Sequence, residues 1–296
     1  MRFYYLVIGM TLAIGLEMAV SWLKGRPGYT VKDTATNLVM SFGEAASVVL
    51  LGGFVYKFYG LLSELTPFEL GTGALAFILC FVVDDFLYYW GHRFSHKIRW
   101  MWASHVVHHS SEKFNLTVAI RQPWTAHLSL TFIVSVPLVL AGMDPAIMAS
   151  INFFTVTYQY SVHTELVPKL GPLEYVLVTP SHHRVHHGSN PRYLDMNYGG
   201  TLIFWDKLFG TFVEENDEDP VKFGLVQNIG SHNPFRVAFT VWWDILRDMG
   251  KLEGWRHPVM TLFGPPGWSI DGTNKTSRQI KEEWAAEQEQ ERAAAE

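Results

Sequence analysis

The sequence has almost no cysteine and little charge. Cys80 is the single cysteine among 296 residues, which excludes an internal disulfide and any metal site built from several thiolates. Charged residues make up 17% of the chain, against roughly 25% in a typical soluble domain. The net charge is −5, whereas a nucleic-acid-binding protein needs a basic surface. We therefore expect no nucleic-acid partner.

The chain also lacks the motifs of several enzyme classes. It contains no HExxH zinc-hydrolase motif, no GxGxxG dinucleotide fingerprint and no CxxCH haem-attachment motif. If the protein performs redox chemistry, its reducing equivalents must therefore come from an external donor.

Long apolar stretches are abundant instead. Residues 3–23 and 38–56 carry one charge each, residues 70–83 carry none, and residues 125–163 carry only Asp144. The last stretch is long enough for two spans joined by a turn, each crossing roughly 30 Å of hydrocarbon. Several such stretches rarely coexist in a soluble domain, so we expect an all-α, multi-pass transmembrane bundle with five crossings.

The basic residues of the connections predict the orientation of this bundle. They gather in residues 24–37 and 91–124, whereas residues 59–69 contain two acids and no basic residue. The positive-inside rule places the first two segments in the cytosol, together with everything from residue 164 onward. The membrane is then the bacterial inner membrane, or the endoplasmic reticulum in a eukaryote.

Histidines are numerous, and eight of the thirteen fall into three spaced groups. The groups are His92 and His96, then His105, His108 and His109, then His183, His186 and His187. Residues three and four apart lie on one face of a helix, so each group can aim its imidazoles at one point. The predicted topology brings all three groups to the cytosolic boundary. Eight imidazoles are too many for one ion and suit two ions with open positions.

Two alternatives remain open from these residues. A membrane haem protein for electron transfer would use paired histidines as axial ligands, and a zinc-dependent membrane hydrolase would use about three ligands plus a catalytic acid. The clustering of the histidines at one boundary favours redox chemistry on a lipid-phase substrate over both.

An acidic residue near the first histidine group is a candidate support. Asp85 ends an apolar run, where a carboxylate is costly and usually functional. It shares a helical stripe with Tyr88, His92 and His96. We expect its carboxylate to accept a proton from a ligand imidazole and to fix the tautomer of that ring.

The histidine pattern resembles the fatty acid hydroxylase/sterol desaturase superfamily. The resemblance rests on DFLYYWGHRFSH at 85–96, HVVHH at 105–109, HRVHH at 183–187, NYGG from Asn197 and WDKLFGTF at 205–212. Within the superfamily, HSSEKFNL from His109, AIRQ at 119–122, QYSVHTE at 159–165 and PSHHRVHHG at 180–188 are most similar to alkylglycerol monooxygenase-like members.

The resemblance implies a membrane-bound oxidoreductase with two iron ions, which zinc can replace in a purified form. It implies O2 and an external electron donor, such as a pterin or a redox protein, for hydroxylation or desaturation of a lipid. It adds His163 as a ninth ligand and places Gln159 where a further histidine can stand. Asn197 and His182 are candidate support residues.

These observations divide the chain into four parts. We expect N-terminal spans over 1–66, a catalytic domain with a cytosolic histidine-rich di-metal cap over 67–215, an interfacial segment over 216–270 and a charged tail over 271–296. Within the third part, the aromatic residues 237–246 predict a helix lying on the membrane.

Overall fold

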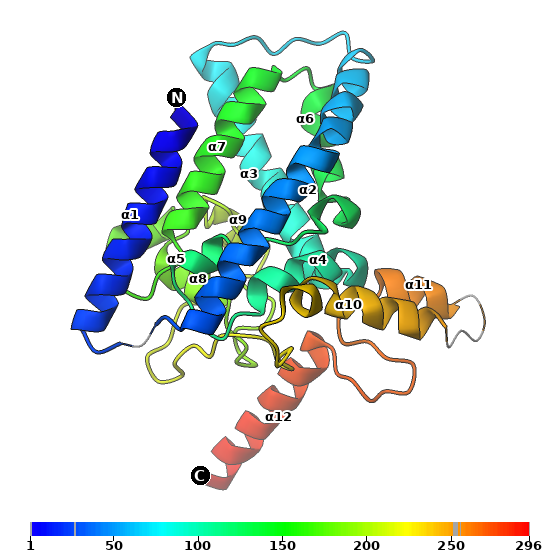
Figure 1. Cartoon of the computed structure of the whole chain (residues 1–296). Helices are drawn as coiled ribbons and strands as arrows, with labels where there is room; N and C mark the ends of the chain where they lie inside the picture. The colour runs from blue at the N-terminus through cyan, green and yellow to red at the C-terminus, as the bar shows by residue number, and fades with distance from the viewer. Residues whose placement is uncertain (1, 27, 251–253, 255, 296) are drawn as a thin grey trace.

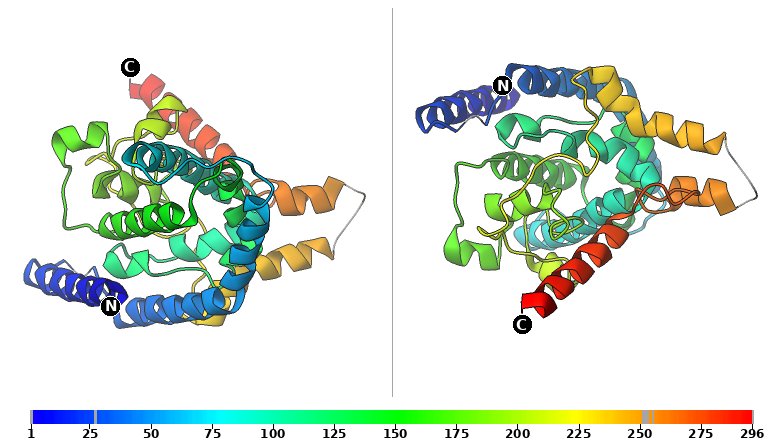
Figure 2. Two further views of the ribbon diagram at one scale, coloured as in Figure 1. Left: turned by 90° about the horizontal axis from the view of Figure 1, so that it is seen from above. Right: turned by 90° about the horizontal axis from the view of Figure 1, so that it is seen from below.

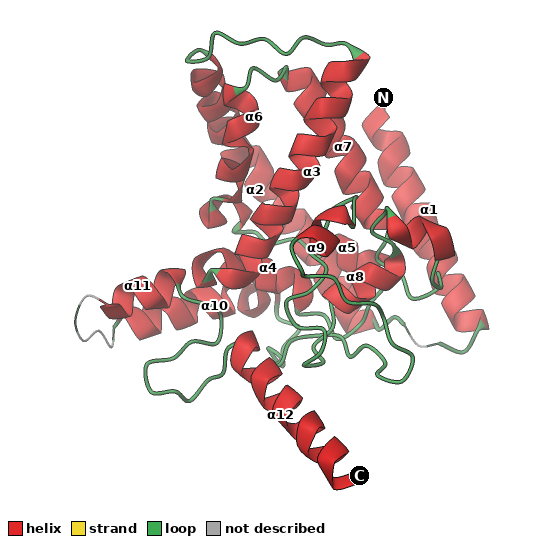
Figure 3. Ribbon diagram, turned by 180° about the vertical axis from the view of Figure 1, so that it is seen from behind, coloured by secondary structure: helices red, strands yellow, loops and turns green. Residues whose placement is uncertain are grey.

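The regular elements in the described part of the chain are all helices. The computed structural model describes residues 2–26, 28–250, 254 and 256–295, and in these ranges the only β-type pairing is two isolated bridges. The predicted all-α class is confirmed. The long helices α1 (Arg2–Leu23), α2 (Val31–Ser63), α3 (Ala74–Lys97) and α7 (Pro145–Ser161) form an elongated bundle, which Figures 1 and 3 show from opposite sides.

Three of the described helices are long and apolar enough to cross a membrane, namely α1, α2 and α3. Their outward faces carry large apolar side chains, including Phe42, Val49 and Phe54, which are 67–83% exposed. Such a surface is unfavourable in water and suits lipid tails. The chain is therefore a membrane protein, whereas the total of five crossings remains a prediction.

The segment 125–163 differs from the continuous spans that the sequence suggests. Its second half is the helix α7, but its first half is divided into η1 (Ala126–Ser129), η2 (Thr131–Ser135) and α6 (Val136–Leu140). Leu130 has a left-handed φ of 62°, which separates η1 from η2. Pro137 then removes a backbone donor in the first turn of α6. The expected turn is present after α6, with Gly142 at φ 79°.

A cap of shorter elements closes one end of the bundle. It consists of the end of α3 with α4 (Arg99–His109), α5 (Leu116–Ala119), η3 (Gly171–Tyr175), α8 (Pro180–His186) and α9 (Phe204–Leu208). The chain turns between α3 and α4 at Ile98, whose φ and ψ of −114° and 117° are extended. This turn folds the second histidine group back toward the first.

The C-terminal helices lie beside the cap. In Figure 1, α10 (Pro234–Met249) crosses the lower end of the bundle, and Figure 2 shows α11 (Arg256–Phe263) beside it. Val237, Ala238 and Ile245 of α10 are buried, whereas Phe235 and Trp243 are exposed. This amphipathic helix lies where the sequence predicts one on the membrane surface. The tail forms α12 (Ser277–Ala295), which projects away from the bundle.

Candidate metal centre

All nine histidines that sequence reasoning proposed as ligands meet in the cap, in two groups. Within each group, one ring nitrogen from every residue lies within 4.8 Å of the others. The five-histidine group contains His92, His96, His105, His109 and His186. The four-histidine group contains His108, His163, His183 and His187.

Two helices contribute to both groups. In α4, His105 and His109 are one turn apart and join the five-histidine group, whereas His108 joins the other. In α8 and directly after it, His183 and His187 join the four-histidine group, whereas His186 does not. The rings of His109 and His187 stack with centroids 4.2 Å apart, so the two groups are adjacent.

The spacing of the ring nitrogens fits metal coordination. The Nε2 atom of His105 lies 3.0 Å from the Nε2 atom of His92 and 3.1 Å from the Nε2 atom of His109. In the other group, Nε2 of His163 lies 3.1 Å from that of His108 and 2.9 Å from that of His183. A metal–nitrogen bond of about 2.0–2.1 Å puts ligands at right angles about 3.0 Å apart. The residues present can therefore hold a cation in each group.

The outer ring nitrogens face backbone carbonyl groups. Nδ1 of His92 donates to the Tyr198 carbonyl at 2.8 Å, and Nδ1 of His163 donates to the Gln159 carbonyl at 2.7 Å. Nδ1 of His186 lies 3.0 Å from the Met196 carbonyl. A carbonyl oxygen only accepts, so each of these rings carries its proton on Nδ1. The Nε2 lone pair is then free to face the group.

Burial keeps these imidazoles uncharged. It lowers the pKa of six cap histidines well below the ordinary value, and neighbouring histidines lower it further: His105, His108, His109, His183, His186 and His187. Burial likewise lowers the pKa of His163 to about 4. The neutral ring is the form that binds a metal, so the centre is ready for metal at pH 7.

The sequence did not predict one carboxylate that lies next to the centre. Asp195 lies 3.6 Å from Nδ1 of His96 and pairs with Lys97 at 2.7 Å. Burial raises its pKa, but the contact with His96 and the charge of Lys97 outweigh burial and lower the pKa to about 2. No spacing in the sequence signals this contact, because Asp195 lies in an irregular loop almost a hundred residues after His96.

The expected role of Asp85 is corrected by its hydrogen bonds. Its carboxylate accepts from the backbone N–H of Thr201 at 2.8 Å and of Leu202 at 3.2 Å, and from Nε1 of Trp205 at 2.9 Å. These partners are not imidazoles. Asp85 fixes a loop that also contains Tyr198, whose carbonyl accepts the hydrogen bond from His92. Asp85 therefore supports His92 indirectly. The fold of this loop determines which donors reach the Asp85 carboxylate. The position of Asp85 on a helical stripe does not reveal that fold.

The other candidate support residues lie around the ligands. His182 belongs to neither group, and its side chain accepts the Thr179 N–H in the capping box that begins α8. Asn197 has a φ of 55° and donates to the carbonyls of His182 and Val213. Gln159 is not among the grouped ligands and accepts a hydrogen bond from Tyr88 at 2.9 Å.

A buried arginine outside the candidate site residues fixes the end of α4. Arg121 is 2% exposed and donates to the Val107 carbonyl at 2.9 Å and to the Ser110 hydroxyl. It also donates to Asn37 of α2 at 2.8 Å. The guanidinium thus ties the turn that carries His108 and His109 to a long helix of the bundle.

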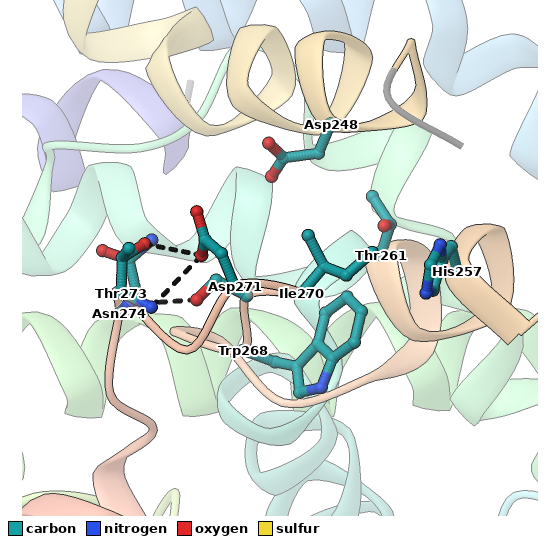
Figure 4. Close-up of a pocket in the computed structure, with 9 residues that line it drawn as sticks. Asp248, His257, Thr261, Trp268, Ile270, Asp271, Thr273 and Asn274 are labelled. Carbon is teal, nitrogen blue, oxygen red and sulfur yellow. Dashed lines mark hydrogen bonds between the residues drawn. The ribbon is translucent and has the colours of Figure 1, made fainter. Parts of the chain in front are cut away.

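A separate small cavity lies between α10, α11 and the loop over 268–274. It measures about 70 Å³, and Asp248, His257 and Thr261 face Trp268 and Asp271 across it (Figure 4). None of its residues belongs to the two histidine groups, so the candidate metal centre lies elsewhere.

Comparison with known proteins agrees with this site. The family model described as "Fatty acid hydroxylase" matches residues 77–211, a range that contains all nine histidines. The proposed limits of 67 and 215 for the catalytic domain remain a prediction. No solved structure matches the chain.

Two kinds of named relative are similar to this chain. Alkylglycerol monooxygenase is 38% identical in Xenopus tropicalis and 37% identical in Homo sapiens, over 86% of this chain and 56–57% of those relatives. Ornithine lipid hydroxylase OlsE of Rhizobium tropici is 30% identical over 65% of this chain and 60% of its own length. The chain thus spans a little more than half the length of these relatives.

Proposed function

We propose that this chain, whose residues 77–211 match the fatty acid hydroxylase family model, belongs to that family and is an O2-dependent lipid monooxygenase with two iron ions. The reaction is hydroxylation or desaturation of an unactivated C–H bond. The observation that carries the proposal is the meeting of nine imidazoles, eight of them buried and that of His105 half-buried, in two adjacent groups.

Two bound irons would supply the oxidation of the C–H bond by O2 with electrons from outside. The chain itself supplies the ligands, five imidazoles for one ion and four for the other. Backbone carbonyls orient His92, His163 and His186. The burial of the rings excludes water, which protects the reaction from side products and strengthens electrostatic interactions. In a purified form, zinc can occupy the same positions.

The substrate we propose is a lipid whose chain enters from the bilayer. The named relatives act on alkylglycerols and on ornithine lipids, which supports a lipid with a long apolar chain. If the oxidised carbon lies next to an ether oxygen, the hydroxylated product is a hemiacetal that falls apart into an aldehyde and an alcohol. If a second hydrogen is removed instead, the product contains a double bond.

We place the centre on the cytosolic side of the bacterial inner membrane or of the endoplasmic reticulum. The basic residues of 24–37 and 91–124, which lie at the cap end of the bundle, support this orientation. A pterin or a redox protein in the cytosol would then deliver the electrons.

The test combines metal analysis with lipid analysis under ¹⁸O2. His108→Ala and His186→Ala, one from each group, should lose bound iron and all oxidised lipid while the protein stays in the membrane. His232→Ala, an exposed histidine outside both groups, serves as the control. A labelled product indicates hydroxylation, and an altered but unlabelled lipid indicates desaturation. Full activity and full iron in either variant would contradict the proposal.

A further inference from the structure

An amide nitrogen beside the metal centre is buried without a hydrogen-bond partner. Nε2 of Gln159 is enclosed by the protein and makes no hydrogen bond. Oε1 of the same amide accepts one from the Tyr88 hydroxyl at 2.9 Å. A buried donor without an acceptor is costly, and folded proteins rarely retain one. The free N–H therefore marks a place for an acceptor that this chain does not provide.

This amide lies on the bilayer side of the centre. Tyr88 precedes His92 by four residues in α3, and Gln159 precedes His163 by four residues. Both α3 and α7 run through the bundle toward the cap, so these two residues are one helical turn nearer the apolar region (Figure 1). His92 belongs to the five-histidine group and His163 to the four-histidine group. The bond between Tyr88 and Gln159 thus joins α3, which carries His92, to α7, which leads to His163.

A glycine packs directly against this pair. A Cβ on Gly200 would lie 2.7 Å from Cδ1 of Tyr88 and 3.1 Å from Nε2 of Gln159. Two residues earlier, the Tyr198 carbonyl accepts from Nδ1 of His92. A side chain at position 200 would therefore press against both Tyr88 and the amide nitrogen, next to a backbone that is fixed to the centre.

We propose that Gln159 determines substrate specificity by donating its Nε2–H to an oxygen of the lipid. An ether oxygen is such an acceptor, and the bond would hold the carbon next to it at the metal centre. A plain hydrocarbon segment would leave the donor unsatisfied and would bind less tightly. This inference rests on the proposed function and names the group that would recognise the oxygen of the substrate.

Binding to the zinc-loaded protein tests the inference without turnover. The probes are 1-O-hexadecylglycerol and its analogue with CH2 in place of the ether oxygen, added to the full chain in detergent micelles. The wild type should bind the ether about tenfold more tightly, the usual effect of one hydrogen bond. Gln159→Met preserves side-chain length but removes the donor, so it should bind both probes equally. Thr157→Val, which removes an exposed hydroxyl from the same helix, should retain the preference.

A second variant distinguishes the loss of the donor from a folding defect in Gln159→Met. Gly200→Ala leaves the amide in place but puts a methyl group against it, so it should also lower the preference for the ether. A preference that persists in Gln159→Met with full bound metal would overturn the inference. The iron-loaded wild type is assayed separately with O2 and a reductant. Absence of any oxidised lipid there would overturn the proposed function, whatever the binding preference.

Discussion

The nine imidazoles are chemically alike, but their outer nitrogens have different partners. His92, His163 and His186 face backbone carbonyls, whereas His96 faces the carboxylate of Asp195. A carboxylate makes an imidazole more basic and strengthens its bond to a metal. His96 is therefore the ligand whose side-chain support can be removed without altering the backbone.

Replacement of this carboxylate should weaken metal binding. In Asp195→Asn the charge beside His96 is lost, and we expect a 10- to 100-fold lower affinity for the metal of the five-histidine group. Competition with a chelator, followed by metal analysis of the purified protein, measures the effect. Asp217→Asn, which changes an exposed carboxylate, should match the wild type. Equal metal affinity in both variants would show that Asp195 does not support the centre.

At the scale of elements, the position of α8 determines whether the groups are complete. This seven-residue helix carries His183 and His186 and is too short to be stable alone. Arg184, between them, donates to Glu215 at 2.7 and 2.6 Å and to the carbonyls of Thr164 and Val167. The bidentate pair thus attaches α8 to two loops of the cap.

Removal of this arginine should release α8. In Arg184→Met we expect a loss of about 1.5–3 kcal/mol in unfolding free energy, the range for hydrogen bonds to charged groups. Thermal unfolding in micelles, compared with Lys222→Met at an exposed lysine, measures it. An unchanged midpoint of thermal unfolding would mean that the remaining contacts are sufficient to hold α8 in place.

The same pair predicts a dependence on pH. Burial raises the pKa of Glu215, but the hydrogen bond and charge of Arg184 outweigh it, so the pKa is lower in the folded protein than the ordinary 4.5. The stability from this pair is complete above that ordinary value and is lost as the pH falls below it. In Arg184→Met this part of the acid sensitivity should be absent.

For the whole molecule, the metal centre joins parts that are otherwise distant. The groups take ligands from α3, α4, the end of α7 and α8, and their rings are buried against one another without charge. Nitrogen lone pairs aimed at one point repel each other when no cation lies between them. Bound metal should therefore stabilise the folded cap.

Metal removal should lower the thermal stability of the protein. Dialysis against a chelator should reduce the midpoint of unfolding in micelles, and added iron or zinc should restore it. His108→Ala should show a smaller response, because the four-histidine group is incomplete. His127→Ala is a control, since His127 lies outside both groups and bonds to Ser47. An identical midpoint with and without metal would indicate that the cap is stable on its own.

The sequence by itself determined the class of the fold and the histidine pattern that resembles the fatty acid hydroxylase family. Apolar length and histidine spacing are local properties, and they survive into the structure because helix geometry fixes which residues share a face. Only the tertiary structure decided how the nine histidines divide into a group of five and a group of four. His108 leaves its neighbours His105 and His109 because it points toward α8 and His163, and such pairing depends on how helices cross. The same holds for Asp195, which reaches His96 through a loop, and for Asp85, whose carboxylate satisfies backbone donors rather than an imidazole.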